Sequence, residues 1–131
     1  MRPNLHKIKG KVVWITGASS GNGEILAYTL AKLGANLVLS ARRETELHRV
    51  LEKCQSKIDY LINNAGCSQR AVAMDTKLEV HKFLLDTNFL GTVSLSTAVL
   101  PYMVKERDGC IVVVSSLSGK IDTSLCSSKK S

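Results

Sequence analysis

The sequence predicts an α/β fold in which helices cover both faces of a doubly wound parallel sheet, giving three layers. Three observations carry this prediction. Short apolar runs recur along the chain without the alternation of half-exposed strands, as expected when both faces of a parallel sheet are covered. Segments with helical spacing of apolar residues lie between these runs. A glycine-rich turn directly follows the first run.

Four apolar runs are predicted to form the strands. They occupy residues 12–15, 37–39, 58–62 and 111–114. Between them, the spacing of apolar side chains predicts helices over residues 22–33, 44–53 and 78–105. We expect Gly34 to end the first helix, an interruption of the third helix near Asp86, and a bend of its last turns at Pro101.

The connection between the second helix and the third strand is unusually short. Three residues separate Cys54 from Ile58, where a doubly wound fold normally has a further strand and helix of roughly thirty residues. Without that unit, the second strand must connect directly to a strand on the far side of the first. A right-handed crossover would then require the second helix to change faces of the sheet. We infer an internal deletion and expect it to be destabilising.

Composition and charge narrow the class of protein. At 131 residues the chain is long enough for a hydrophobic core and for at most one domain, over residues 1–131. The net charge of +7 is scattered rather than gathered into an aromatic-interleaved stripe, so we expect no nucleic-acid partner. A basic balance also favours a phosphorylated ligand. We find no signal segment and no run of transmembrane length, which predicts a cytoplasmic protein.

The cysteines give no sign of a metal site or a disulfide framework. Their spacing matches neither a zinc site nor a redox pair, and we expect free thiols that are buried or half-buried. The four residues are Cys54, Cys67, Cys110 and Cys126.

The turn after the first strand is the strongest functional signal. Residues 16–23 read Thr-Gly-Ala-Ser-Ser-Gly-Asn-Gly and lie between a predicted strand and a predicted helix. Glycines there permit a tight bend, let the backbone approach a pyrophosphate and allow the helix to pack closely on the strand. Free N–H groups at the start of the helix then face the anion. The predicted dinucleotide contacts are Gly17, Ser19, Ser20, Gly21, Asn22 and Gly23.

The end of the second strand indicates which dinucleotide binds. A site for NAD places an acidic residue there, which hydrogen-bonds the ribose hydroxyls. This chain has Arg42 and Arg43 instead. A guanidinium can hold a 2′-phosphate through two hydrogen bonds, so we predict NADP(H) as the cofactor. The alternative is a pair of solvated arginines at a strand end.

Two further motifs follow the third and fourth strands. Residues 63–66 read Asn-Asn-Ala-Gly, and residues 115–116 are a serine pair. Together with the glycine turn, they resemble the short-chain dehydrogenase/reductase family over nearly the whole chain. The resemblance implies an incomplete Rossmann-like sheet and cofactor contacts by Asn64, Ala65 and Gly66. It also implies hydride transfer between NAD(P)(H) and an alcohol or carbonyl.

The same resemblance implies catalytic roles, because the family uses an Asn-Ser-Tyr-Lys set. Asn88 matches the asparagine that holds a water in a proton relay, and its alternative is a structural amide within an apolar helix. Ser116 matches the serine that hydrogen-bonds the substrate oxygen. Its alternative is a serine turn with Gly119.

The tyrosine of that set is missing from its expected position, which Leu125 occupies. Leucine has no ionisable proton, so the general acid/base of the reaction would be lost. Lys129 matches the lysine that binds the nicotinamide ribose and lowers the pKa of the tyrosine. It is equally consistent with a basic tail.

Three functions therefore stay open. The chain is an NADP(H)-dependent oxidoreductase that acts on a hydrophobic carbonyl or alcohol; steroid- or retinoid-like substrates are implied by resemblance to one subgroup. Alternatively, it is a non-catalytic remnant that binds NADP(H) or pairs with a full-length relative through its third helix. Both a homo- and a hetero-oligomer stay open as its state of assembly. In the third case it folds poorly, with an exposed sheet edge. The subgroup resemblance also implies the endoplasmic-reticulum membrane as an alternative location.

Overall fold

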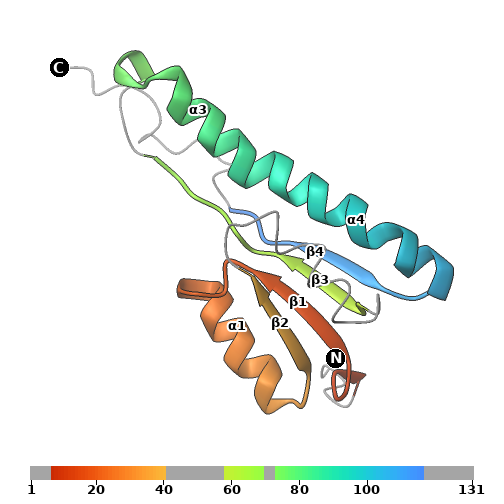
Figure 1. Ribbon diagram of the computed structural model, residues 1–131. Helices are drawn as coiled ribbons and strands as arrows, with labels where there is room; N and C mark the ends of the chain where they lie inside the picture. Colours follow the sequence, from red (N-terminus) through yellow and green to blue (C-terminus); the bar gives the residue numbers. More distant parts are fainter. Residues whose placement is uncertain (1–6, 41–57, 70–72, 117–131) are drawn as a thin grey trace.

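The computed structural model describes residues 7–40, 58–69 and 73–116 (Figure 1). Its strands are β1 (Val12–Thr16), β2 (Asn36–Ser40), β3 (Tyr60–Asn63) and β4 (Cys110–Val113). Its helical segments are α1 (Gly21–Lys32), the 3-10 turn η2 (Ala73–Asp75), α3 (Leu78–Leu85), the π-helical turn η3 (Asp86–Leu90) and α4 (Gly91–Glu106). The helix predicted over residues 44–53 and the short connection after Cys54 lie outside the described residues.

The described strands form one parallel sheet in the order β2-β1-β3-β4. On β1, Val13 lies opposite Leu37 of β2 on one side and opposite Tyr60 of β3 on the other. The third strand is therefore on the far side of the first from the second, as predicted. Figure 1 shows α1 on one face of the sheet and α4 on the other, which confirms the three-layer α/β architecture.

Successive side chains of β1 point to opposite faces of the sheet, which divides the core into two layers. Trp14 faces α4 and packs with Leu61 and Val99, whereas Ile15, the next residue, faces α1 and packs with Ala27. Ile15, Leu61 and Val99 are 0% exposed. Because both faces of β1 are covered, its sequence is apolar throughout rather than alternating.

Helices α3 and α4 are continuous rather than separate. The predicted interruption near Asp86 is the π-helical turn η3, in which the N–H of Gly91 bonds to the carbonyl of Asp86, five residues earlier. The helix then continues through Pro101 and ends at Arg107, a cap in the left-handed region with φ 52°.

The length of this helix corrects one expectation. Within the described part of the chain, Leu78–Glu106 is long and apolar enough to cross a membrane, judged by length and composition alone. The core helix of a soluble protein meets the same criterion, and here one side of the helix does pack on the sheet through Val99 and Met103. Few of its other residues are buried.

Strand β4 differs from prediction in its exposure. Cys110 is exposed rather than buried, because β4 is an edge strand among the described residues. Cys67 is half-buried as expected, and both thiols are free. The other two cysteines, Cys54 and Cys126, lie outside the described residues.

An ion-pair cluster ties three strands together at the amino end of the sheet. The Lys11 ammonium donates to Asp59 at 3.0 Å and to Asp108 at 3.3 Å. The other oxygen of the buried Asp59 carboxylate accepts from the backbone N–H of Val12 at 2.8 Å. The hydrogen bond to Asp59, followed by that to Asp108, raises the pKa of Lys11 above its ordinary value of 10.5.

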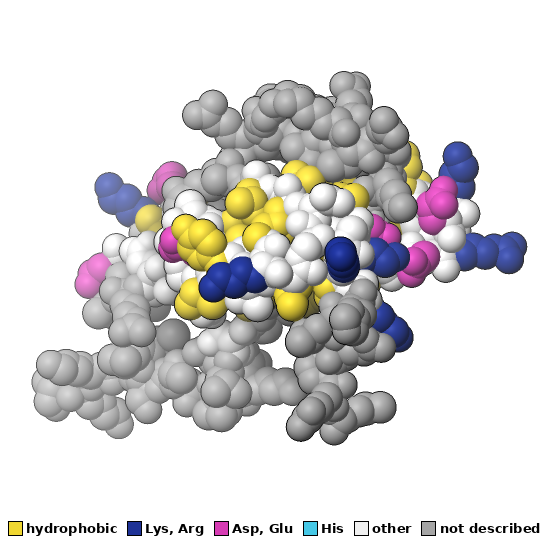
Figure 2. Space-filling view, turned by 90° about the horizontal axis from the view of Figure 1, so that it is seen from below, with side chains coloured by type: hydrophobic (Ala, Val, Ile, Leu, Met, Phe, Trp, Pro, Cys, Tyr) yellow, Lys and Arg dark blue, Asp and Glu magenta, His cyan; other side chains and the backbone are white. Residues whose placement is uncertain are grey.

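Exposed apolar side chains occur outside the core as well. Viewed from below Figure 1, hydrophobic side chains gather near the middle of the described surface, with several Lys and Arg side chains projecting around them (Figure 2). On α1 the exposed apolar side chains are Ile25 and Tyr28.

Candidate cofactor and catalytic site

The glycine turn is pressed against the loop that follows β3. Gly17 has φ 64°, a conformation that side chains other than glycine rarely adopt. A Cβ atom at Gly17 would lie 2.8 Å from the Cα of Ala65. The absence of a side chain therefore lets the backbones of the turn and the loop approach each other.

Gly23 brings the first turn of α1 equally close. A Cβ atom there would collide with the carbonyl oxygen of Gly17 and with the side-chain amide of Asn64. Gly23 is accordingly buried, and it fixes where α1 begins relative to β1. This is the close helix–strand packing that the motif predicts.

Gly21 has a different environment. Its φ is 58°, yet a Cβ atom would meet nothing within 4 Å. The neighbouring Ser19, Ser20 and Asn22 are also exposed. Ser20 is the N-cap of α1, and its side chain makes no capping hydrogen bond to the first N–H groups of the helix. An open backbone with uncapped N–H groups fits the pyrophosphate of a dinucleotide.

Thr16 holds the loop after β3 against the turn. Its hydroxyl oxygen accepts the backbone N–H groups of Asn64 and Ala65, each at 3.0 Å. In return, the side-chain amide of Asn64 donates to the carbonyls of Thr16 and Gly17, each at 3.1 Å. These four hydrogen bonds join two segments nearly fifty residues apart in sequence. They place the predicted cofactor residues of the turn and of the Asn-Asn-Ala-Gly loop at one site.

Asn88 lies in the π-helical turn and hydrogen-bonds to the end of the same loop. Its Oδ1 accepts from the backbone N–H of Cys67, and its Nδ2 donates to the carbonyl of Cys67, both at 2.8 Å. The side chain therefore acts as a structural amide. Its role in a proton relay stays a prediction.

Ser116 follows β4 at the carboxyl end of the sheet. Val113 pairs with Asn63, and the N–H of Val114 bonds to the carbonyl of Asn63 at 2.9 Å. Ser116 is thus carried to the same edge as residues 64–66, which is where ligands bind in open α/β sheets. Its side chain is exposed.

Several predicted site residues belong to segments other than the described ones. Arg42 and Arg43, expected to select the cofactor, lie outside the described residues, as do Lys129 and Leu125. Among the residues that are described, no group of three or more His, Cys, Asp or Glu side chains is arranged to hold a metal ion.

Sequence reasoning missed three participants in this site. It did not identify the Thr16 hydroxyl, the Cys67 backbone or Asn63 as contributors. Asn63 is 3% exposed; its Nδ2 donates to Ser96 of α4 at 3.2 Å, and its Oδ1 has no partner in the described structure. The signal for Thr16 was its place directly before the first glycine. The other two contacts join distant segments and leave no local signal.

The parallel sheet, the glycine turn between β1 and α1 and the loop locked against it define a nucleotide-binding α/β domain of the Rossmann type. Comparison with known proteins is more specific. The model of the short chain dehydrogenase family matches residues 11–57 and 51–128. The chain therefore belongs to the short-chain dehydrogenase/reductase family of oxidoreductases.

One curated relative is human dehydrogenase/reductase SDR family member 7, which is 43% identical over 156 positions covering 90% of this chain and 46% of the relative. The chain thus spans about half the length of that relative. The aligned region is longer than the whole 131-residue chain, so the relative has residues inside it without counterparts here. This agrees with the inferred internal deletion.

Solved structures agree on the fold. The alcohol dehydrogenase of Comamonas testosteroni that is specific for bulky-bulky ketones is 26% identical, with a TM-score of 0.77, over 86% of this chain and 57% of that protein. A gluconate 5-dehydrogenase from Burkholderia cenocepacia, solved with NADP and tartrate, is 20% identical, with a TM-score of 0.78. The match covers 93% of this chain and 60% of that protein. The second of these proteins thus carries a nicotinamide dinucleotide on the same fold.

Proposed function

We propose that residues 1–131 form one incomplete cofactor-binding domain, which binds NADP(H) at the glycine turn. The observation that supports this most directly is the contrast within the turn. Gly17 and Gly23 are packed against the loop and the strand, while Gly21 and the uncapped start of α1 face open space. A rigid cradle with an open, N–H-rich surface suits a pyrophosphate.

Selection of NADP(H) over NAD(H) is assigned to Arg42, with Arg43 beside it. β2 ends at Ser40, at the carboxyl edge where β1 leads into the glycine turn, and Arg42 follows two residues later. The guanidinium charge of Arg42 would pair with the 2′-phosphate of NADP(H), whereas NAD(H) has an uncharged ribose hydroxyl at that position. The net charge of +7 also favours NADP(H), which carries the additional phosphate.

The chemistry supplied by a bound nicotinamide in this family is hydride transfer to or from a carbonyl or alcohol carbon. In this chain, Asn88 would position the loop and hold a water, and Ser116 would hydrogen-bond the substrate oxygen. Lys129 would contact the ribose. Leu125 cannot exchange a proton, so we infer that the 131-residue chain binds the cofactor but does not turn over a hydrophobic carbonyl or alcohol.

The test is thermal unfolding of the purified chain with and without NADP⁺. A ligand present at one hundred times its Kd stabilises the folded state by about 2.7 kcal/mol, which raises Tm measurably. Arg42→Ala should reduce the rise with NADP⁺ and spare any rise with NAD⁺. Arg49→Ala removes the same charge in the same segment and should leave the rise unchanged. No rise with NADP⁺ would refute cofactor binding.

Turnover is tested separately with NADPH and hydrophobic ketones, including steroid- and retinoid-like carbonyls. We expect no oxidation of NADPH above the rate without protein. Steady NADPH oxidation that co-purifies with the chain through two orthogonal columns would refute the inferred catalytic defect, without affecting the proposed binding.

A further inference from the structure

Asn22 differs from the other described asparagines in the freedom of its side chain. The others each donate a side-chain hydrogen bond at 2.8–3.2 Å, namely Asn36, Asn63, Asn64 and Asn88. Asn22 is exposed, and no hydrogen bond holds its side chain among the described residues. Its amide is therefore free to rotate, whereas the amides of the others must first break a contact.

The residue after Asn22 makes this amide chemically unusual as well. Asn22 is the only asparagine in the sequence that is followed by a glycine, Gly23. In such a pair, no side chain hinders the glycine nitrogen from approaching the side-chain carbonyl carbon of the asparagine. Attack by that nitrogen closes a five-membered succinimide ring, which is the usual route of spontaneous deamidation.

The backbone around Asn22 is loosely held. Gly21 has φ 58°, a left-handed conformation that interrupts the regular helix before Asn22. The hydrogen bond from the N–H of Glu24 to the carbonyl of Ser20 is 3.4 Å long, beyond the usual range of about 2.7–3.2 Å. The N–H of Gly23 precedes this bond, in the part of a helix where N–H groups have no partner within the helix. Its nitrogen is therefore not engaged in the hydrogen bonding of α1.

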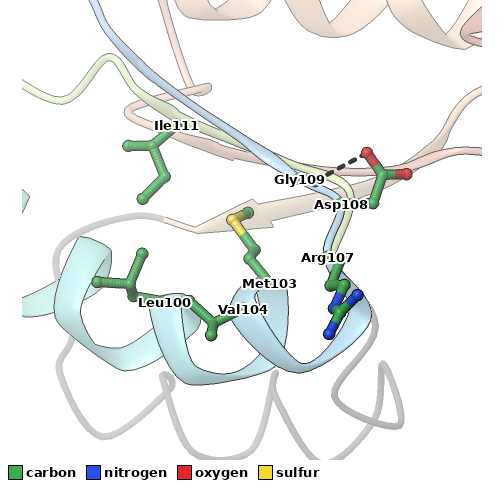
Figure 3. A pocket seen from close by; sticks show the side chains of 7 residues that line it. All are labelled: Leu100, Met103, Val104, Arg107, Asp108, Gly109 and Ile111. Atoms are coloured by element: carbon green, nitrogen blue, oxygen red, sulfur yellow. Dashed lines mark hydrogen bonds between the residues drawn. The ribbon is translucent and has the colours of Figure 1, made fainter.

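A second pair that could close the same kind of ring is held in place. Asp108 and Gly109 connect α4 to β4 and line the open groove drawn in Figure 3. The N–H of Gly109 donates to Oδ1 of Asp108 at 2.9 Å, and the other carboxylate oxygen accepts from the Lys11 ammonium at 3.3 Å. An ionised carboxylate resists attack by a nitrogen, so this pair should stay intact where Asn22 reacts.

We propose that Asn22 is a site of spontaneous deamidation, and that the product loses affinity for NADP(H). The Gly23 nitrogen bonds to the side-chain carbonyl carbon, its proton and the side-chain NH2 leave as ammonia, and a succinimide remains. Water then opens the ring. Attack at the side-chain carbonyl gives aspartate, and attack at the main-chain carbonyl gives isoaspartate. The loss of affinity rests on the proposed cofactor site, whereas the deamidation does not.

Both products oppose a dinucleotide at the glycine turn. Aspartate adds a carboxylate at the start of α1, where it repels the pyrophosphate. The helix itself favours that charge, because the positive end of its dipole lies there. Isoaspartate lengthens the main chain by a methylene beside Gly23, where a Cβ atom would already collide with the carbonyl oxygen of Gly17 and the side-chain amide of Asn64. Aspartate should therefore weaken binding without destabilising the fold, and isoaspartate should do both.

The experiment ages the purified chain in mildly alkaline buffer and measures conversion at each asparagine by peptide mass spectrometry. Asn22 should convert about tenfold faster than any hydrogen-bonded asparagine, because those must first break their contacts. NADP⁺ should slow this conversion, because a bound pyrophosphate would accept the N–H of Gly23. Asn22→Gln closes no five-membered ring, so the NADP⁺ affinity with which this variant starts should not fall on ageing.

Calorimetry with two charge variants tests the effect on binding. Asn22→Asp should raise the Kd for NADP⁺ about tenfold or more, because like charges a few ångströms apart at a protein surface repel by more than the free energy of a tenfold change. Asn36→Asp adds the same charge at the amino end of the sheet and should leave the Kd unchanged.

The outcomes separate the modification from the cofactor site. Conversion of Asn22 no faster than that of Asn36 would overturn the proposal. So would an unchanged Kd in Asn22→Asp, or an equal rise in Asn36→Asp, when the unmodified chain binds NADP⁺. An unmodified chain that does not bind NADP⁺ would refute the cofactor site and the loss of affinity together, and the peptide masses would still decide the deamidation.

Discussion

The two sides of the sheet differ in how completely their strands are enclosed. β1 has strands on both sides and helices on both faces, and Trp14 and Ile15 are almost fully buried. β4 is just as apolar in sequence, yet Val113 is more than half exposed. Similar valine-rich runs therefore have opposite environments in one domain. Apolar composition predicts a strand, but only its neighbours determine whether that strand is buried.

The difference separates two regions of the chain. The enclosed region contains the glycine turn and the loop after β3, joined by four hydrogen bonds, and it is suited to hold a ligand in fixed geometry. In the open region, no further strand pairs with the outer side of β4 among the described residues. Substitutions that act on one region should leave the other largely unaffected.

The largest contrast is expected between two truncations on neighbouring strands. Leu61→Ala on β3 removes a fully buried side chain and should lower the free energy of unfolding by about 2–5 kcal/mol. Val113→Ala on β4 should change it by less than about 0.5 kcal/mol at concentrations where the chain is monomeric. Urea unfolding measures both. Equal losses would show that β4 is enclosed in solution.

The next effect distinguishes two glycines of the cofactor turn. Gly23→Ala places a methyl group against Gly17 and Asn64, and it should destabilise by about 1–3 kcal/mol and abolish the NADP⁺-dependent rise in Tm. Gly21→Ala meets open space, so only its left-handed backbone should oppose the substitution, by about 1–2 kcal/mol. A ligand response in Gly23→Ala equal to that of the wild type would contradict the packed cradle.

A substitution of Asn64, in the same region, should have a smaller effect than Gly23→Ala. Asn64→Ala removes two hydrogen bonds to the carbonyls of Thr16 and Gly17, and it should destabilise by about 1–3 kcal/mol while weakening NADP⁺ binding. Asn88→Ala is the comparison, since it frees Cys67 but leaves the turn intact. Its effect on NADP⁺ affinity, measured by calorimetry, should be the smaller of the two. The reverse order would show that the π-helical turn controls the cofactor site.

The smallest effect concerns the ion pairs at the amino end. The pKa of Lys11 is raised by its hydrogen bond to Asp59 and then by that to Asp108. The stabilisation is therefore complete below 10.5, the ordinary pKa, and is lost as pH rises through the higher folded value. Unfolding free energy measured from neutral to alkaline pH should fall in this range. Lys11→Met should remove that fall, whereas Lys32→Met on α1 should keep it.

Much of the enclosed region could be predicted from the sequence, because its signals are local. The apolar run before the turn, the three glycines and Gly34 at the end of α1 fall where they were expected, and Gly34 has φ 81°. Strand order also followed from the short connection near Cys54. What could not be predicted depended on distant neighbours: the exposure of Cys110, and Cys67 as the hydrogen-bond partner of Asn88, arise only once the sheet has formed.

The π-helical turn changes which side chains of the long helix share a face. A π-turn contains one residue more than an α-turn, and each residue rotates an α-helix by about 100°. The side chains of α3 are therefore rotated around the helix axis relative to those of α4. A single helical wheel drawn through Leu78–Glu106 would assign the side chains of either α3 or α4 to the wrong face. Deleting Thr87 would restore the phase and turn α3 away from its present orientation.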